Sequence, residues 1–262
     1  IPFPKAPSTA SMANLQNHSS ARDTGLSIGV IVTDALATSE YLHALCEGLC
    51  ALILKDSSAN KCGVICSSFE IGACMLLDES QFMEIKKAFV DQVLTRLRHL
   101  AREEAELLAR LHEHHPHSPL PEMSIRISKM MSRVSDSLIA NWAKMDEAQT
   151  NNLKTLVLEH LPPILLERVG DSLWSKMPEA YLQWMMAKSL AAKIVYREGF
   201  EYLETMEDAD LAGLALRYLH LEQERDVLTE NILQSDLQYK HRVAALLHDA
   251  GIFSTMGKRH NS

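Results

Sequence analysis

The stretch that decides the fold is Leu52-Ile-Leu-Lys-Asp-Ser-Ser-Ala-Asn-Lys-Cys-Gly-Val-Ile-Cys-Ser-Ser-Phe-Glu-Ile-Gly-Ala-Cys-Met-Leu-Leu77. It opens with an apolar run at 51–54, which has the length of a buried strand. Polar residues follow from Lys55 to Lys61, and from Ser68 onward apolar residues recur at helical spacing. We therefore predict a strand, a polar loop and a helix. Ligands lie at the carboxyl ends of strands in open α/β sheets, and helix N-termini bind anions, so a site is expected here.

On the N-terminal side, the β-branched run 28–33 predicts another short strand. Thr38 or Ser39 can cap a helix that continues to Cys50, which makes 28–54 similar to a βαβ unit. Residues 1–25 are rich in Pro, Ser, Thr and Asn, and such a segment buries too little apolar surface to offset its ordering entropy. We therefore expect residues 1–25 to be disordered.

On the C-terminal side, the sequence predicts helices only from Asp78 onward, because no segment alternates as a strand does. The clearest helix, 78–115, carries an apolar stripe that includes Phe89, Val93 and Leu97 and stops before Pro116. Further helices are expected at 122–142, 149–160, 164–169, 177–197, 208–221, 227–233 and, capped by Ser235 or Asp236, up to Ala250. Gly199 and Gly251 are placed as C-terminal caps. We expect core positions for the tryptophans, which are Trp142, Trp174 and Trp184.

The composition is that of an ordinary globular protein. The chain has 262 residues, of which 47% are hydrophobic and 23% are charged. A net charge of −8 argues against binding to nucleic acid or to an anionic membrane, and no apolar run approaches the ~18 residues of a membrane-spanning helix. The five cysteines are read as free thiols of an intracellular protein. The chain begins at Ile1, so we expect a fragment of a longer protein.

The pattern Asn60-x-x-Gly63-Val64-x-x-Ser67-x-x-Glu70 resembles the Asn-Ala-Gly-Gly-Val-x-x-Ser-x-x-Glu motif of the glutamate dehydrogenases. The fuller run from Lys55 to Glu70 looks like the large-subunit, NAD-specific branch, and the resemblance covers roughly residues 50–110. A second block, Leu190-Ala-Ala-Lys-Ile-Val-Tyr-Arg-Glu-Gly199, is similar to the C-terminal helical region of the same enzymes. The chain departs from the small hexameric enzymes at Lys61 and Cys62, where they have Ala and Gly.

This resemblance implies a mainly α fold, in which a C-terminal remnant of a Rossmann-type α/β domain at 26–77 precedes a helical domain at 78–262. It implies NAD as cofactor and oxidation of L-glutamate to 2-oxoglutarate and ammonia. Asn60 and Gly63 would lie at the nicotinamide riboside, Val64 would line the substrate pocket, and Ser67 would hydrogen-bond the distal carboxylate of glutamate. We expect a homo-oligomer in the mitochondrial matrix or cytoplasm.

Parts of the enzyme are missing from this chain. No Gly-x-Gly-x-x-Gly follows a strand, so the pyrophosphate-binding element is absent from the sequence. The catalytic Lys and Asp of the family belong to a substrate domain that this chain lacks. Lys55 and Asp56 match a structural part of the motif and are not assigned to that role. We therefore expect the chain to be inactive alone, with no catalytic residue of its own.

Three other interpretations stay open. Ser67 could be a plain N-cap in a polar turn. The chain could be a non-catalytic helical interaction module derived from the enzyme. Finally, Cys46, Cys50, Cys62 and Cys66 could hold zinc in an adaptor protein, and the histidines between 112 and 117 could bind a metal adventitiously.

Overall fold

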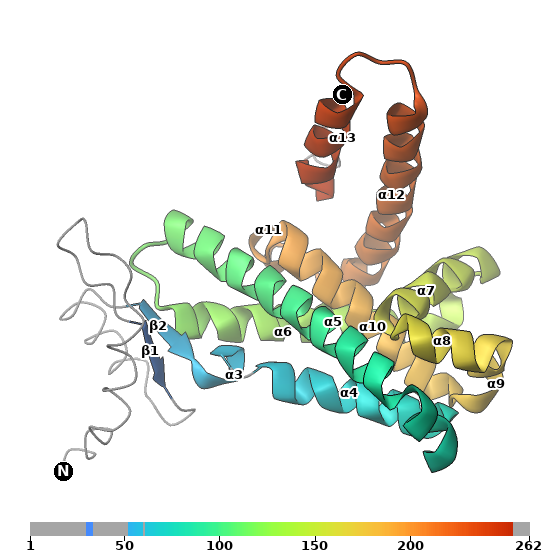
Figure 1. Ribbon diagram of the computed structural model, residues 1–262. Helices are drawn as coiled ribbons and strands as arrows, with labels where there is room; N and C mark the ends of the chain where they lie inside the picture. The colour runs from blue at the N-terminus through green and yellow to red at the C-terminus, as the bar shows by residue number, and fades with distance from the viewer. Residues whose placement is uncertain (1–29, 34–51, 60, 254–262) are drawn as a thin grey trace, which may run out of the picture. The chain divides into compact units, whose positions relative to one another are not determined.

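The fold is predominantly helical. In the computed structural model, residues 30–33, 52–59 and 61–253 are described. They divide into two compact units, of which the first is drawn from Ile1–Lys61 and Leu108–Ile125 and the second from Cys62–Leu107 and Arg126–Ser262. The expected fold class, mainly α, is confirmed (Figure 1). The disorder predicted for residues 1–25 and the helix predicted up to Cys50 lie outside the described residues.

The described part of the first unit contains two short strands. β1 (Val30–Thr33) and β2 (Leu52–Lys55) pair in parallel, with Val30 opposite Leu52 and Thr33 opposite Lys55 (Figure 1). Parallel neighbours require a crossover connection, so their pairing agrees with the expected order of two strands separated by a longer segment. α3 (Asp56–Ala59) follows β2 directly, and the hydroxyls of Ser58 and Ser124 are hydrogen-bonded to each other within this unit.

The helices occupy most of the positions that the sequence predicts. Their bounds are α4 (Lys61–Leu76), α5 (Glu79–His114), α6 (Leu120–Ala140), α7 (Glu147–His160), α8 (Pro163–Val169), α9 (Leu173–Lys176), α10 (Glu179–Glu198), α11 (Glu201–Glu204), α12 (Asp208–Gln234) and α13 (Lys240–Asp249). Two 3₁₀ turns lie at Trp142–Lys144 and Gly170–Ser172. No strand occurs within residues 78–253, as expected.

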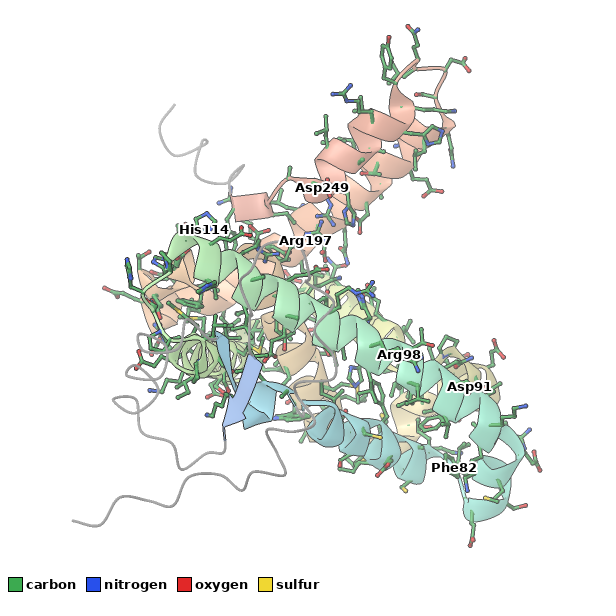
Figure 2. The ribbon with its side chains drawn as sticks, turned by 60° about the vertical axis from the view of Figure 1, so that its left-hand side comes forward. Phe82, Asp91, Arg98, His114, Arg197 and Asp249 are labelled. Atoms are coloured by element: carbon green, nitrogen blue, oxygen red, sulfur yellow. The ribbon has the colours of Figure 1, made fainter. Side chains whose placement is uncertain are left out.

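Apolar stripes explain how the helices of the second unit pack. Phe89, Val93 and Leu97 are buried on α5, while charged residues such as Asp91 and Arg98 stand off that stripe along the same helix (Figure 2). α10 is buried over most of its length, because apolar residues of small and large size occupy most of its circumference. Its buried residues are Leu182, Met185, Met186, Ala187, Leu190, Ala191, Ile194, Val195 and Tyr196. It is therefore the central helix of this unit, and α7 and α12 both pack on it.

Helix ends follow their capping residues. The side chain of Asp146 accepts a hydrogen bond from the N–H of Gln149, and the side-chain oxygen of Gln149 accepts one from the N–H of Asp146, which is a capping box at the start of α7. Gly199 ends α10 with a φ of 82°, a conformation that favours glycine, so this cap is confirmed.

Several expectations about the helices and their residues were wrong. The polar segment after β2 is not a loop: α3 and α4 occupy it, because Asp and Ser are as suitable for a first helical turn as for a loop. The segments 208–221 and 227–233 form one helix, since the residues between them are good helix formers. The last helix begins at Lys240, not at Ser235 or Asp236, and it ends before Ala250 without a left-handed Gly251.

Trp184 is not a core residue, as had been expected. It is 44% exposed, because it lies beside the buried face of α10, where it stacks near Tyr181.

Candidate functional site

The predicted site residues fall on the N-terminal half of α4. Gly63, Ser67 and Glu70 are spaced by four and three residues, which places them on one face of the helix. All three are exposed, and this face continues through Ile71 and Cys74, which are exposed as well. Asn60 and the side chain of Val64 lie outside what the structure describes. In the sequence, Asn60 precedes Gly63 by three residues, and Val64 precedes Ser67 by three.

Ser67 is not the N-cap that one interpretation assigned to it. It lies in the second turn of α4, and its hydroxyl donates to the carbonyl oxygen of Gly63 at 3.3 Å. The next serine, Ser68, turns toward the interior and donates to the carbonyl oxygen of Ile65 at 2.7 Å. The two adjacent serines therefore differ in exposure, and the Ser67 hydroxyl can turn away from its long hydrogen bond to the Gly63 carbonyl and donate to an acceptor outside the helix.

The opposite face of α4 fixes the helix in the second unit. Phe69 is fully buried and its ring stacks on His160 of α7, with ring centroids 4.8 Å apart. Gly72 is also buried, and a Cβ there would meet Leu161 at 3.4 Å. The Lys176 ammonium donates to the Leu76 carbonyl at 2.9 Å at the end of the helix. The exposed face is thus presented on a helix that is well anchored.

His160 is neutral near physiological pH. Burial lowers the pKa of its imidazole to about 4, and the positive charge of Arg96 acts in the same direction. Its role is that of an aromatic packing partner for Phe69.

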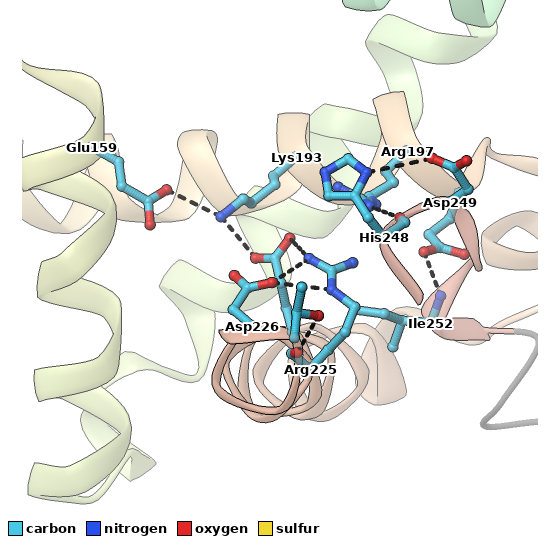
Figure 3. A network of polar contacts seen from close by, with 11 residues as sticks. Glu159, Lys193, Arg197, Arg225, Asp226, His248, Asp249 and Ile252 are labelled. Carbon is cyan, nitrogen blue, oxygen red and sulfur yellow. Dashed lines mark hydrogen bonds and ion pairs between the residues drawn. The ribbon is translucent and has the colours of Figure 1, made fainter. Parts of the chain in front are cut away.

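A second polar cluster, which the sequence did not reveal, joins three helices (Figure 3). Lys193 of α10 lies 2.7 Å from the Glu222 carboxylate of α12 and 3.0 Å from the Glu159 carboxylate of α7. Glu222 is buried and also meets Arg225 at 3.5 Å. Burial lowers the pKa of Lys193, but its hydrogen bonds and charge interactions with Glu222 and Glu159 outweigh that effect, so the net pKa is raised. The lysine therefore stays protonated and holds the three helices together.

The buried Tyr196 hydroxyl forms a further link, donating to the Glu104 carboxylate at 2.9 Å. Burial, followed by the charge of Glu103, raises the pKa of Tyr196, so it remains a neutral donor. Lys193, Glu222, Tyr196 and Glu104 all take part in these pairings, and none of the pairings sets a nucleophile beside a general base. They are structural, and no short-range pattern marks them because the partners are 92 residues apart.

Nothing in the described part of the chain supports a metal centre. No group of three or more His, Cys, Asp or Glu side chains there is arranged to hold a metal ion. Cys46, Cys50 and the side chain of Cys62 lie outside that part, so the zinc interpretation stays a prediction. Among the described helices, none is both long enough and apolar enough to cross a membrane.

Comparison with known proteins supports the resemblance to the glutamate dehydrogenases. No family model matches the chain, and no solved structure gives a significant match. The NAD-specific glutamate dehydrogenase of Saccharomyces cerevisiae is 27% identical over 220 residues, which is 77% of this chain and 20% of that protein. Glutamate dehydrogenase 2 of Dictyostelium discoideum is 24% identical over 229 residues, or 79% of this chain and 21% of that protein. The NAD-specific enzyme of Neurospora crassa is 28% identical over 162 residues, or 56% of this chain and 15% of that protein.

The chain is thus a mainly helical protein that presents a motif-bearing helix face, and it is similar to glutamate dehydrogenases. More particularly, it resembles the NAD-specific glutamate dehydrogenases, over most of its own length. It spans about a fifth of the length of the first two of these relatives.

Proposed function

We propose that this chain is the C-terminal part of an NAD-specific glutamate dehydrogenase, an intracellular enzyme of the mitochondrial matrix or cytoplasm. The whole enzyme oxidises L-glutamate to 2-oxoglutarate and ammonia with NAD as hydride acceptor. Residues 26–77 are then the last piece of a Rossmann-type dinucleotide-binding domain, and 78–262 are the helical C-terminal domain. The parallel pair of β1 and β2, followed at once by helix, supports this assignment.

The observation that carries the proposal is the exposed face of α4. Gly63 and Ser67 occupy it, on a helix whose other face is held by Phe69 and Gly72. In the whole enzyme, Ser67 donates to the distal carboxylate of glutamate, and Val64 borders the same pocket. Gly63 allows the nicotinamide to approach closely, and the Asn60 amide offers a donor and an acceptor to its riboside.

A matched pair of serine variants tests this assignment in the whole protein that contains this chain. Ser67→Ala should lower kcat/KM for glutamate roughly 10- to 100-fold, because a hydrogen bond to a charged group contributes about 1.5–3 kcal/mol, with little change in the KM for NAD. Asn60→Ala should instead act mainly through the KM for NAD. Ser68→Ala is the control, because Ser68 is half-buried and its hydroxyl is held at 2.7 Å by the Ile65 carbonyl, whereas Ser67 is exposed. Equal effects of Ser67→Ala and Ser68→Ala would remove Ser67 from the glutamate site.

The second candidate, a non-catalytic interaction module, is favoured by the exposed apolar residues of the C-terminal helices. Under that alternative the whole protein has no glutamate-dependent activity, and neither serine matters to a reaction.

A further inference from the structure

The buried contacts of α4 lie on the C-terminal side of Ser67. In the described part of this helix, the buried residues are Phe69, Gly72, Ala73 and Leu76. The described residues that precede Ser67 in α4 are exposed or half-buried. Ser67 is therefore carried just ahead of the anchored part of the helix, and Phe69 is the first anchor that follows it.

Two adjacent residues at the end of α7 engage this buried face. The His160 ring stacks on the Phe69 ring with centroids 4.8 Å apart and an interplanar angle of 19°. The next residue, Leu161, is buried and lies against Gly72, where a Cβ would be 3.4 Å from its Cδ2 atom. Phe69 and Gly72 are three residues apart, so they share one helix face. The end of α7 thus contacts α4 at two successive points.

α7 is itself fixed to the core of the second unit. Leu153, Leu156 and Val157 are buried on it, and the helix packs on α10. At the other end of α4, the Lys176 ammonium donates to the Leu76 carbonyl oxygen at 2.9 Å. The position of α4 is therefore determined by residues that lie about 90 or more positions later in the chain.

We infer that His160 and Phe69 are positioning residues, whose stacked rings set where the Ser67 hydroxyl lies in the glutamate site. This inference rests on the proposed function. Ser67 precedes Phe69 by two residues, which is about 200° around a helix, so a shift of the buried ring moves the exposed hydroxyl with it. A hydrogen bond to a carboxylate requires about 2.7–3.2 Å, and a misplacement of about 1 Å is enough to break it.

A double-mutant cycle in the whole protein that contains this chain tests this role by steady-state kinetics. His160→Ala should lower kcat/KM for glutamate about 10-fold, because loss of the stacked ring lets α4 shift. In a Ser67→Ala background the same change should lower it by less than about 2-fold, because the hydrogen bond that depends on the position of α4 is already gone. A ring that only stabilised the fold would have the same effect in both backgrounds.

His160→Phe is the matched control. Burial lowers the pKa of His160 to about 4, so its ring is neutral near pH 7.5 and phenylalanine is a close replacement. This variant should keep kcat/KM for glutamate within about 2-fold of wild type. Phe69→Leu is a second route to the same test, since it keeps an apolar side chain in the core but removes the ring. It should show the same dependence on Ser67, and circular dichroism verifies that each variant is folded.

Two results would overturn the inference. One is an equal loss of kcat/KM from His160→Ala in the wild-type and Ser67→Ala backgrounds, which would make the stacked pair structural only. The other is an unchanged kcat/KM in both His160→Ala and Phe69→Leu. Either result leaves the proposed function in place if Ser67→Ala alone lowers kcat/KM for glutamate. A whole protein that does not oxidise glutamate would instead contradict the proposed function, and this role of His160 with it.

Discussion

At the scale of single residues, two residues of the same type differ in exposure according to the face of the helix on which they lie. Ser67 and Ser68 are neighbours, yet only Ser67 is exposed and only Ser68 is turned inward. His160 likewise differs from the exposed histidines, because its packing against Phe69 and its burial lower its pKa. The chemistry available at a position therefore depends on burial, which a single sequence reports only indirectly.

Burial of His160 predicts a specific dependence of stability on pH. The imidazole pKa is about 4 in the folded chain and about 6.5 when unfolded, so the unfolded state binds a proton first as pH falls. The contribution of His160 to the free energy of unfolding is fully present above about pH 6.5 and is lost as the pH falls from about 6.5 to 4. At pH 5 this loss should be about 2 kcal/mol.

Urea unfolding at pH 7.5 and 5.0 measures this dependence, with His160→Phe as the comparison. Phenylalanine keeps an aromatic ring against Phe69 but cannot titrate. Between the two pH values, the free energy of unfolding of the variant should therefore fall by about 2 kcal/mol less than that of wild type. The difference between the proteins cancels the contributions of other titrating groups. An equal loss in both would show that His160 is not buried as described.

At the scale of elements, the helices that could be predicted are those with clear stop signals and stripes. Pro116 and Gly199 end their helices where the sequence indicates, because one cannot continue a helix and the other adopts a positive φ readily. The start of α4 could not be predicted, since Asp56-Ser-Ser58 suits a loop and a helical first turn equally. The cluster of Glu159, Lys193 and Glu222 was also beyond prediction, because tertiary packing alone brings these residues together.

The stripe of α5 predicts a contrast between two leucines on the same helix. Leu97 is buried and Leu94, less than a turn away, is exposed. Leu97→Asp should lower the free energy of unfolding by about 3 kcal/mol or more, because it places an unpaired charge in the core. Leu94→Asp should change it by less than about 1 kcal/mol. Chemical denaturation of both variants measures the contrast, and comparable destabilisation by the two substitutions would mean that α5 is not packed on this face.

At the scale of the whole molecule, the proposed function makes this chain one surface of an active site without the rest of that site. The resemblance assigns Gly63 and Ser67 to a site, which stays a prediction, and the helix that carries both residues was expected to begin later in the sequence. The sequence holds no glycine-rich phosphate cradle and no Lys–Asp pair assigned to proton transfer. Hydride transfer requires the substrate carbon and the nicotinamide to be held at near-attack distance, so one wall of the pocket cannot support the reaction.

The most direct test of the proposed function is glutamate-dependent reduction of NAD, followed by absorbance for the whole protein that contains this chain and for residues 1–262 alone. The whole protein should oxidise L-glutamate. The isolated chain should show no turnover at high protein concentration and no NAD binding tighter than about 0.1 mM by calorimetric titration. A whole protein that is inactive toward glutamate, or an isolated chain that reduces NAD, would contradict the assignment of this chain as one part of the glutamate site.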